Sequence, residues 1–391
     1  MNSAERHEAR YQRRKAAREK KRREKLDKYD NMEHVASIPA LLHANWDSKK
    51  GVMFKASVAR YNRNAFINAA KQSKALLAGK DVRQGFHHFT IIERGKERKI
   101  HSLHYGERVI RRSVCINALV PILSSNLIYD NGASLKGKGV GFSADRCEAH
   151  LHRYFREHGS NEGYVITIDF KSYFNNIPHE PLKSYIDRYV LDPQLNRLTD
   201  QFIEAPDLDR PPEEHGKGLY IGPEDSQIYA VAYPNDIDHL IKDKWRQKYF
   251  DRYNDDSVLI VPDKETAHRL YDALMVEYER KGIIPNRKKT QIVKLSRGFT
   301  FLKTKYFLTD TGKVVRKTDH AGIVRERRKL KKQYRFYIKG EMTLDQITQS
   351  FMSWRGSALK RNAYRSVHCM DTLYYGFFKA KPWKKTKKRS K

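Results

Sequence analysis

Two adjacent carboxylates in the segment Tyr253-Asn254-Asp255-Asp256 have the clearest chemistry in this sequence. Each of two neighbouring aspartates raises the pKa of the other unless a cation compensates. The apolar run Ser257–Val261 follows them, which predicts a hairpin tip at the mouth of a buried strand. A lone Asp-Asp pair is more often a solvated acidic turn, but carboxylates at the mouth of a strand favour a hard divalent cation.

A third carboxylate, Asp169, stands at the end of the apolar run Val165–Ile168, 86 residues before Asp255. The run is mostly β-branched and follows Gly163, so it predicts a buried strand. Taken alone, Asp169 is a strand-end residue that caps the next turn. Taken with Asp255 and Asp256, it completes the pattern of a two-metal phosphoryl-transfer site, whose ions lie roughly 3.5–4 Å apart.

Six motifs, in order between about Phe86 and about Tyr375, resemble those of bacterial reverse transcriptases. The motifs are Thr90–Arg111, Thr167–His179 (TIDFKSYFNNIPH), Gly218–Ile241, Tyr253–Asp256, Gly282–Thr290 and Arg297–Leu308. The third motif, with Ile-Gly and Ser-Gln, is similar to that of diversity-generating and antiphage-defence enzymes. The resemblance implies an α+β right-hand polymerase with fingers, a palm made of an antiparallel sheet with packed helices, and a helical thumb.

The resemblance also implies an RNA-directed DNA polymerase, a nucleotidyltransferase that uses two Mg²⁺ ions, for which Mn²⁺ can substitute. The implied metal ligands are Asp169, Asp255, Asp256 and the main-chain carbonyl of Phe170. Of these, Asp256 is expected to contribute less directly. Lys289 stands at the position of the family's proton donor. The implied partners are an RNA template, dNTPs and the DNA product.

Nucleotide-binding residues follow from the same resemblance. Arg98 first and Lys96 second would meet the incoming triphosphate, and Phe174, five residues after Asp169, would exclude a 2′-hydroxyl by its bulk. A core phenylalanine is the alternative for Phe174. The remaining nucleotide contacts are expected at Gly222, Ser226 and Gln227.

The chain departs from the family pattern at three places. Glu224 and Asp225 are acidic beside the expected path of a phosphate. Pro234 falls inside an expected helix, where it costs about 3 kcal/mol or forces a kink, so the helix should bend or restart near Asn235. Lys303 stands where the family usually has Gly in its primer-grip hairpin.

The formal net charge of +32 indicates a polyanionic partner. Residues 313–391 carry +18 and residues 1–30 carry +6, so the long middle of the chain is nearly balanced. A membrane partner is not expected, because the basic stretches lack a broad apolar face. The charge distribution favours basic ends that hold nucleic acid, and the family resemblance implies that the template is a structured noncoding RNA.

The expected divisions are a basic extension (1–30), N-terminal helices and fingers (31–160), a palm (161–310), a helical thumb (311–378) and a basic tail (379–391). The basic extension favours helix but lacks an apolar stripe, so it is either a solvated tail or a segment that folds along RNA. In the helical stretch of residues 31–85, Phe54, Val58, Tyr61 and Phe66 are expected to form a buried face.

The thumb prediction rests on helical periodicity. One expected stripe comprises Leu344, Ile347, Phe351, Trp354 and Ala358, and a preceding helix has Leu330, Tyr334 and Ile338 on its apolar side. The nucleic-acid-binding candidates on that preceding helix are Arg325, Arg327, Arg328, Lys329, Lys331 and Lys332.

Cys115, Cys147 and Cys369 are widely spaced, which predicts reduced core thiols in a cytoplasmic protein. Three functions remain open: copying a dedicated noncoding RNA in antiphage defence, which we favour; a diversity-generating retroelement; and a noncatalytic RNA-binding scaffold on a polymerase fold. The sequence leaves open the primer, a protein partner and a homo-oligomer.

Overall fold

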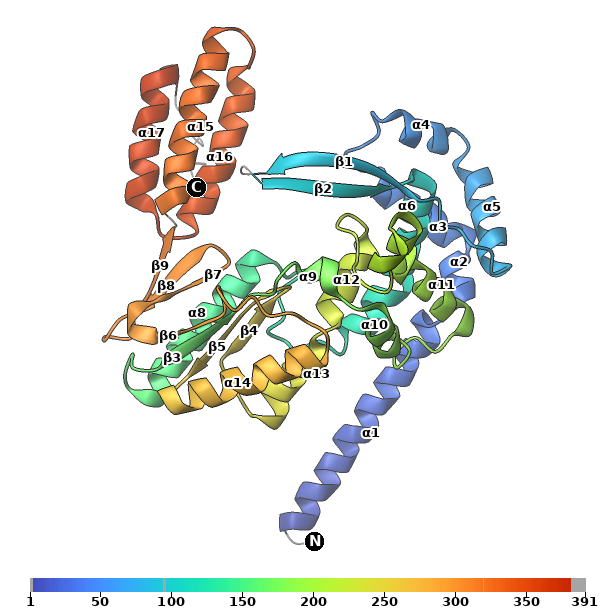
Figure 1. The fold of residues 1–391 in the computed structure, drawn as a ribbon, viewed down its shortest axis with the longest axis horizontal. Coiled ribbons are helices and arrows are strands. Elements are labelled where there is room, and N and C mark those ends of the chain that lie inside the picture. Colours follow the sequence, from blue (N-terminus) through green and yellow to red (C-terminus); the bar gives the residue numbers. More distant parts are fainter. Residues whose placement is uncertain (1–2, 94–95, 319, 381–391) are drawn as a thin grey trace, which may run out of the picture.

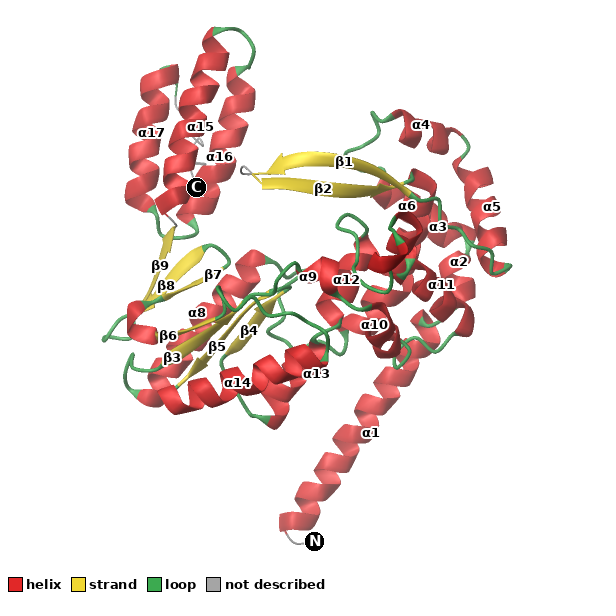
Figure 2. Ribbon diagram, viewed as in Figure 1, coloured by secondary structure: helices red, strands yellow, loops and turns green. Residues whose placement is uncertain are grey.

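The described residues form helices and three antiparallel sheets (Figures 1 and 2). The structure, a computed structural model, describes residues 3–93, 96–318 and 320–380. The sheets are a two-stranded hairpin, a four-stranded central sheet and a three-stranded sheet. The α+β class predicted from the sequence is therefore confirmed.

The central sheet has the strand order β4-β5-β3-β6. Its strands are β3 (Tyr164–Ile168), β4 (Phe250–Tyr253), β5 (Asp256–Val261) and β6 (Gln291–Lys294). Tyr253 pairs with Asp256 across the turn between β4 and β5. Both the buried strand before Asp169 and the acidic hairpin tip are thus confirmed.

The two faces of the central sheet bury different partners, because side chains alternate along each strand. Ile166 belongs to the main core, to which α14 (Lys264–Arg280) contributes its apolar side. Val165, its neighbour, packs instead in a second cluster with Leu151 of α8 (Val140–His158). Covered on both faces, the sheet is a rigid support for the residues at its strand ends.

A second sheet and a helical bundle follow the central sheet in the chain (Figure 1). The sheet contains β7 (Phe299–Phe301), β8 (Thr304–Leu308) and β9 (Val314–Thr318). The C-terminal bundle consists of α15 (His320–Ile338), α16 (Leu344–Leu359) and α17 (Tyr364–Phe378).

The C-terminal bundle has a core of its own. The stripe predicted on α16 is confirmed, since Ile347 and Phe351 are buried and Trp354 packs against them. On α15, Leu330 is buried as expected, but Ile338 is 66% exposed, so its assignment to the apolar side is wrong. Ile338 is the last residue of α15, where the chain turns away before the next helix covers it.

Helices and one hairpin precede the central sheet. They are α2 (Met32–Ala36), α3 (Ile38–Ser48), α4 (Ala56–Arg63), α5 (Ala65–Leu77), β1 (Phe86–Glu93), β2 (Lys96–Leu103), α6 (Tyr105–Val114), the π-helical turn Cys115–Leu119 and α7 (Val120–Ser124). Val58 is buried and Tyr61 packs nearby, as predicted. Phe54 and Phe66 are 83% and 64% exposed, so their predicted burial is wrong. Phe54 lies in a turn before α4, and Phe66 follows the break between α4 and α5, so helical periodicity does not connect them.

The remaining helices lie between β3 and β4 in the chain. They are α9 (Tyr173–Asn176), α10 (His179–Ile186), α11 (Pro193–Ile203), α12 (Glu224–Ala232), α13 (Asn235–His239) and the π-helical turn Leu240–Lys244. The predicted effect of Pro234 is confirmed, because α12 ends before it and α13 restarts at Asn235.

The N-terminal segment forms one helix, α1 (Ser3–Tyr29), which extends from the rest of the molecule in Figure 1. Leu26 and Tyr29 in its last turn pack against the main core. Of the cysteines, Cys115 and Cys147 are buried, but Cys369 is exposed, so the prediction of a core thiol is wrong there. Within the described ranges, no helix has the length and apolarity needed to cross a membrane. The basic tail lies outside the described residues from position 381 onward.

Candidate active site

Three carboxylates meet at one end of the central sheet. Ile168 of β3 pairs with Ser257 of β5, so the antiparallel register brings Asp169, the next residue, beside Asp256. Asp255 precedes Asp256 in the turn between β4 and β5. The structure thus brings Asp169 together with the adjacent Asp255 and Asp256, although Asp169 and Asp255 lie 86 residues apart in the sequence.

The electrostatics of this acidic cluster oppose full ionisation. Burial, together with the charges of Asp255 and Asp169, raises the pKa of Asp256 to about 6. Burial and the charge of Asp169 also raise the pKa of Asp255. The cations Lys289 and Lys303 lower the pKa of Asp256, but burial and the neighbouring acids outweigh them.

The loop before β6 holds Asp169 in place. Asn286 Nδ2 donates to Asp169 Oδ2 at 2.9 Å, and the main-chain N–H of Asn286 donates to the Asp169 carbonyl at 2.7 Å. Thr290 Oγ1 lies 3.2 Å from both the main-chain nitrogen and the carbonyl oxygen of Asp169. Lys289 Nζ lies 3.1 Å from Asp169 Oδ1. Sequence reasoning named Lys289 and missed Asn286 and Thr290, although all three belong to one motif.

The residues of the acidic cluster fit a divalent cation. Each of the three acids offers carboxylate oxygens, which are the ligands that Mg²⁺ and Ca²⁺ prefer. In addition, the buried Oδ1 of Asn254, in the same turn, accepts no hydrogen bond within the described part of the chain. A divalent ion would lower the pKa of Asp255 and Asp256 by supplying the positive charge that Lys289, 64% exposed, supplies only weakly.

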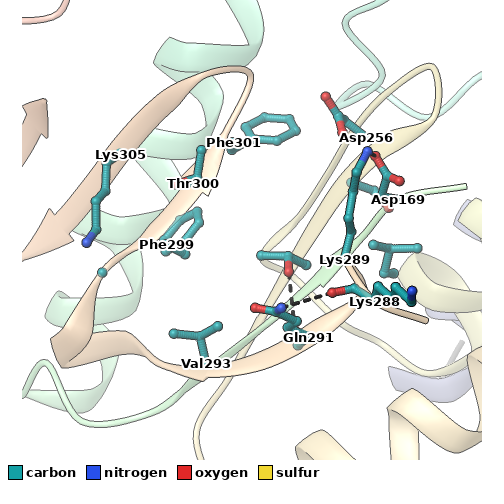
Figure 3. Close-up of a pocket in the computed structure, with 14 residues that line it drawn as sticks. Asp169, Asp256, Lys288, Lys289, Gln291, Val293, Phe299, Thr300, Phe301 and Lys305 are labelled. Carbon is teal, nitrogen blue, oxygen red and sulfur yellow. Dashed lines mark hydrogen bonds and ion pairs between the residues drawn. The ribbon is translucent and has the colours of Figure 1, made fainter. Parts of the chain in front are cut away.

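A cavity of about 460 Å³ opens next to the acidic cluster (Figure 3). Asp169, Asp256 and Lys289 lie at one end of it, and the hairpin residues Phe299 and Phe301 lie along another side. The space therefore connects the candidate metal ligands with the hairpin that corresponds to the expected primer grip.

The hairpin between β7 and β8 forms without the glycine that the family pattern has. Phe301 pairs with Thr304, so Leu302 and Lys303 make a two-residue turn, with φ values of +48° and +61°. Such turns require positive φ at both central residues, which explains why glycine is usual at one of them. Lys303 adopts this conformation, and it lies close enough to Asp256 to lower that pKa.

Phe170 and Phe174 flank the segment after Asp169. The side chain of Phe170 is buried, with its ring centroid 4.8 Å from that of Tyr278. Phe174, in α9, is half-buried against the main core, and its carbonyl accepts the N–H of Leu219 at 2.7 Å. The metal-binding role of the Phe170 carbonyl and the gating role of Phe174 remain predictions.

The predicted nucleotide contacts lie on β2 and at the start of α12. Lys96 and Arg98 belong to β2, and their side chains lie outside the described part of the structure. Gly222 approaches the same strand, because a Cβ there would lie 2.8 Å from the carbonyl oxygen of His101. Ser226 is buried in α12 and Gln227 is half-buried.

Both acids at the start of α12 form ion pairs with arginines of α6. Arg111 Nη1 lies 2.6 Å from Asp225 Oδ2, and both side chains are almost fully buried. Arg112 pairs with Glu224. Two arginines of α6 therefore compensate the charge of the acids that depart from the family pattern.

The six basic candidates of α15 are exposed. Lys329 also lies 3.4 Å from Glu326, its neighbour on the same helix. The outer face of α15 is therefore accessible, as a nucleic-acid-binding surface requires, and the role of these residues remains a prediction.

A second cluster of metal-ligating side chains contains Asp130, His150 and Asp251, all buried. Here the charges are already compensated, since Lys242 and Arg146 lie 2.7 and 2.6 Å from Asp130. His150 Nδ1 lies 2.7 Å from Asp251. These ion pairs join α8, β4 and the turn after α13, and two cations in contact with Asp130 would repel a metal ion.

A family model described as reverse transcriptase (RNA-dependent DNA polymerase) matches residues 108–306. No curated protein matches. The apo telomerase of Candida tropicalis matches at 15% identity and a TM-score of 0.43, over 60% of this chain and 48% of that one. The telomerase of Candida albicans with the TWJ fragment of telomeric RNA matches at 14% identity and a TM-score of 0.45, over 75% and 56%. The chain thus spans about half the length of these structures.

The different burial of the two acids in α12 leads to a stability prediction. Asp225→Ala should lower the free energy of unfolding by about 3–5 kcal/mol, because it leaves Arg111 buried with one carboxylate fewer. The matched variant Glu224→Ala should cost less than about 1 kcal/mol, since its pair with Arg112 is partly exposed. Denaturant unfolding of both variants measures this, and equal losses would contradict the internal role of Asp225.

Proposed function

The chain belongs to the reverse transcriptase family, whose model covers half of it, and from this membership we propose that it synthesises DNA on an RNA template. The RNA is a dedicated structured noncoding RNA, copied in antiphage defence. In this proposal β1 and β2 with the surrounding helices are the fingers, the central sheet is the palm and the C-terminal bundle is the thumb. The right-hand polymerase fold itself follows from the family.

The acidic cluster carries this proposal. Burial and the neighbouring acids raise the pKa values of Asp255 and Asp256, and holding these charges beside Asp169 costs stability that a bound divalent cation would offset. A noncatalytic scaffold would have no use for this arrangement, which argues against the third interpretation of the sequence. Asp169, Asp255 and Asp256 would hold divalent cations, with the Phe170 carbonyl as a further ligand.

The chemistry is nucleotidyl transfer from a dNTP to a primer hydroxyl. When bound, the two divalent ions, Mg²⁺ or Mn²⁺, lower the pKa of the primer hydroxyl and stabilise the pyrophosphate leaving group. Residues of the chain itself are proposed to donate the proton, neutralise the phosphates and orient the metal ligands. Lys289, beside Asp169, donates a proton to the leaving group, while Lys96 and Arg98 neutralise the triphosphate. Asn286 and Thr290 hold Asp169 in its orientation.

Selection of the nucleotide depends on the segment after Asp169 and the start of α12. Phe174 excludes the 2′-hydroxyl, supported by its position five residues after Asp169 and its partial exposure. Gly222, Ser226 and Gln227 contact the nucleotide. The need for glycine at position 222 is supported by its close approach to β2.

Binding of the RNA depends on the basic ends. The exposed arginines and lysines of α15 form one part of this surface, and the long helix α1 forms the other. Both ends carry an excess of positive charge, and the nearly balanced middle of the chain has no matching excess of acids to neutralise it. The long basic helix α1 supports defence over a diversity-generating retroelement. The acidic pair of α12 gives no such support, because ion pairs with Arg111 and Arg112 explain it.

The metal assignment predicts loss of synthesis without loss of binding. Replacing Asp255 and Asp256 by Ala should abolish Mg²⁺-dependent extension of a primer on RNA by the purified protein, while RNA binding survives. The control Asp310→Ala removes an exposed acid in the turn before β9 and should leave extension unchanged. Extension at the wild-type rate by the double variant would refute the assignment.

The proposed gate predicts a change in sugar selectivity. Phe174→Ala should raise the ratio of rNTP to dNTP incorporation, because it removes the bulk that excludes a 2′-hydroxyl. Phe54→Ala, in an exposed turn, provides an aromatic control that should not alter the ratio. Single-nucleotide incorporation assays give the ratio, and a folded, active Phe174 variant with an unchanged ratio would place the gate elsewhere.

The basic ends predict a salt-dependent affinity for RNA. Each phosphate contact adds about −0.7 to −0.9 to the slope of the logarithm of the binding constant against the logarithm of the salt concentration. Charge reversal at Arg325, Arg327, Arg328 and Lys329 should weaken binding and flatten the slope, and deletion of residues 1–30 should do so more mildly.

Salt titrations with the copurifying RNA and a scrambled RNA measure this effect. Charge reversal at Lys264 and Arg269, exposed on α14, is the control and should change little. If the charge-reversed, truncated and wild-type proteins bind both RNAs alike, the basic ends do not hold the template. Sequencing of the copurifying RNA and DNA, together with the neighbouring genes, distinguishes defence from diversification.

A further inference from the structure

The break between α12 and α13 frees main-chain carbonyls next to the acidic cluster. In a continuous helix, the carbonyl of Ala230 would accept the N–H of residue 234. Pro234 has no N–H, so this bond cannot form. The freed carbonyl instead accepts the Tyr173 hydroxyl at 2.6 Å, in a buried position.

The next carbonyl, that of Val231, accepts a side-chain donor. Arg252 Nη2 donates to it at 2.6 Å. Arg252 belongs to β4 and is fully buried. Its Nε lies 2.9 and 2.7 Å from the two carboxylate oxygens of Asp238, which is also fully buried and lies in α13.

Arg252 has a third contact, in the turn that carries the candidate metal ligands. Its Nη1 donates to the carbonyl of Asn254 at 3.3 Å. Asn254 has a φ of +53°, in the left-handed region that non-glycine residues adopt at a cost. One guanidinium therefore connects both sides of the helix break to the residue before Asp255.

Tyr173 provides the second connection, to the segment after Asp169. It is buried, and the centroid of its ring lies 5.2 Å from that of Phe170 and 5.8 Å from that of Phe174. Its hydroxyl bond to Ala230 therefore fixes a ring that lies between the residue after Asp169 and the proposed gate.

We propose that Arg252 and Tyr173 are positioning residues, which use the carbonyls freed by Pro234 to hold the two acid-bearing segments in register. Arg252 sets the turn of Asp255 against α12 and α13, and Tyr173 sets the segment of Asp169 against α12. The proposal rests on the proposed polymerase function. An ordinary buried ion pair needs only Asp238, whereas Arg252 directs its other donors to Val231 and Asn254.

The alternative, in which Arg252 and Asp238 only stabilise the fold, is testable by replacing the pair. A buried ion pair can be exchanged for apolar residues of similar volume without loss of stability. The double variant Arg252→Met/Asp238→Leu should therefore recover stability but not the contacts to the two carbonyls. Arg252→Lys keeps the charge but has a single nitrogen, which cannot reach Asp238, Val231 and Asn254 together.

The expected result is a loss of turnover in proteins that remain folded. Primer extension by Arg252→Lys and by the double variant should show kcat lowered roughly 100-fold with KM for the dNTP little changed, since misplacement by about 1 Å costs this much. Tyr173→Phe should lower kcat more mildly and raise the ratio of rNTP to dNTP incorporation. Lys183→Met, which removes the ion pairs of Lys183 with Glu180 and Glu204, is the control and should retain wild-type kcat.

A binding measurement separates this proposal from the proposed function. Titration of the protein with Mn²⁺, followed by electron paramagnetic resonance without nucleotide, should show affinity lowered roughly tenfold in both Arg252 variants, as for other residues that orient metal ligands. A wild-type protein that binds Mn²⁺ but does not extend primers would refute the polymerase, and the Mn²⁺ titrations would still test the positioning. Wild-type kcat and Mn²⁺ affinity in the double variant would overturn the proposal, and Arg252→Lys gives the same two readings if the double variant fails to fold.

Discussion

The central constraint in this protein is the repulsion among three partly desolvated carboxylates. Asp169, Asp255 and Asp256 lie where the neighbouring strands β3 and β5 end or begin, and burial adds to the cost of their mutual repulsion. Nothing local favours such an arrangement, so the surrounding structure must impose it. The central sheet provides the register, the loop before β6 holds Asp169 by its carboxylate and its main chain, and both faces of the sheet are covered by packed side chains.

Compensation of charge distinguishes the candidate site from other acids in the interior. Asp225 and Asp238 are also fully buried, but each has an arginine within hydrogen-bonding distance. Asp130 has both a lysine and an arginine. By contrast, Lys289 and Lys303, which partly compensate the acidic cluster, are both exposed, so its negative charge remains available to a cation. Asp225 and Asp238, with their buried arginine partners, support the fold, whereas the acidic cluster lacks such a partner among the described residues.

The helix break at Pro234 shows how a local defect can organise distant segments. A proline inside a helix leaves a carbonyl without its partner, and burial makes that carbonyl costly unless another donor reaches it. Here the donors are Tyr173 and Arg252, one from each of the segments that carry the acids. Hydrogen bonds from other elements therefore replace the missing main-chain bond, and both acid-bearing segments are held by the C-terminal end of α12.

The sequence by itself determined the local patterns. β-branched residues before Asp169 and after Asp256 specify strands, and the three-and-four spacing in α16 specifies a helix with one apolar side, because both depend on neighbours within a few residues. The same holds for the helix break at Pro234, because the proline ring itself removes the N–H that a continuous helix needs. The tertiary structure alone decided which acids are neutralised, since Arg111 and Asp225 lie 114 residues apart and only packing brings them together. It also decided that Phe54 and Ile338 are exposed and that Arg252 reaches three acceptors. Burial and charge compensation depend on long-range neighbours, which a periodic pattern does not encode.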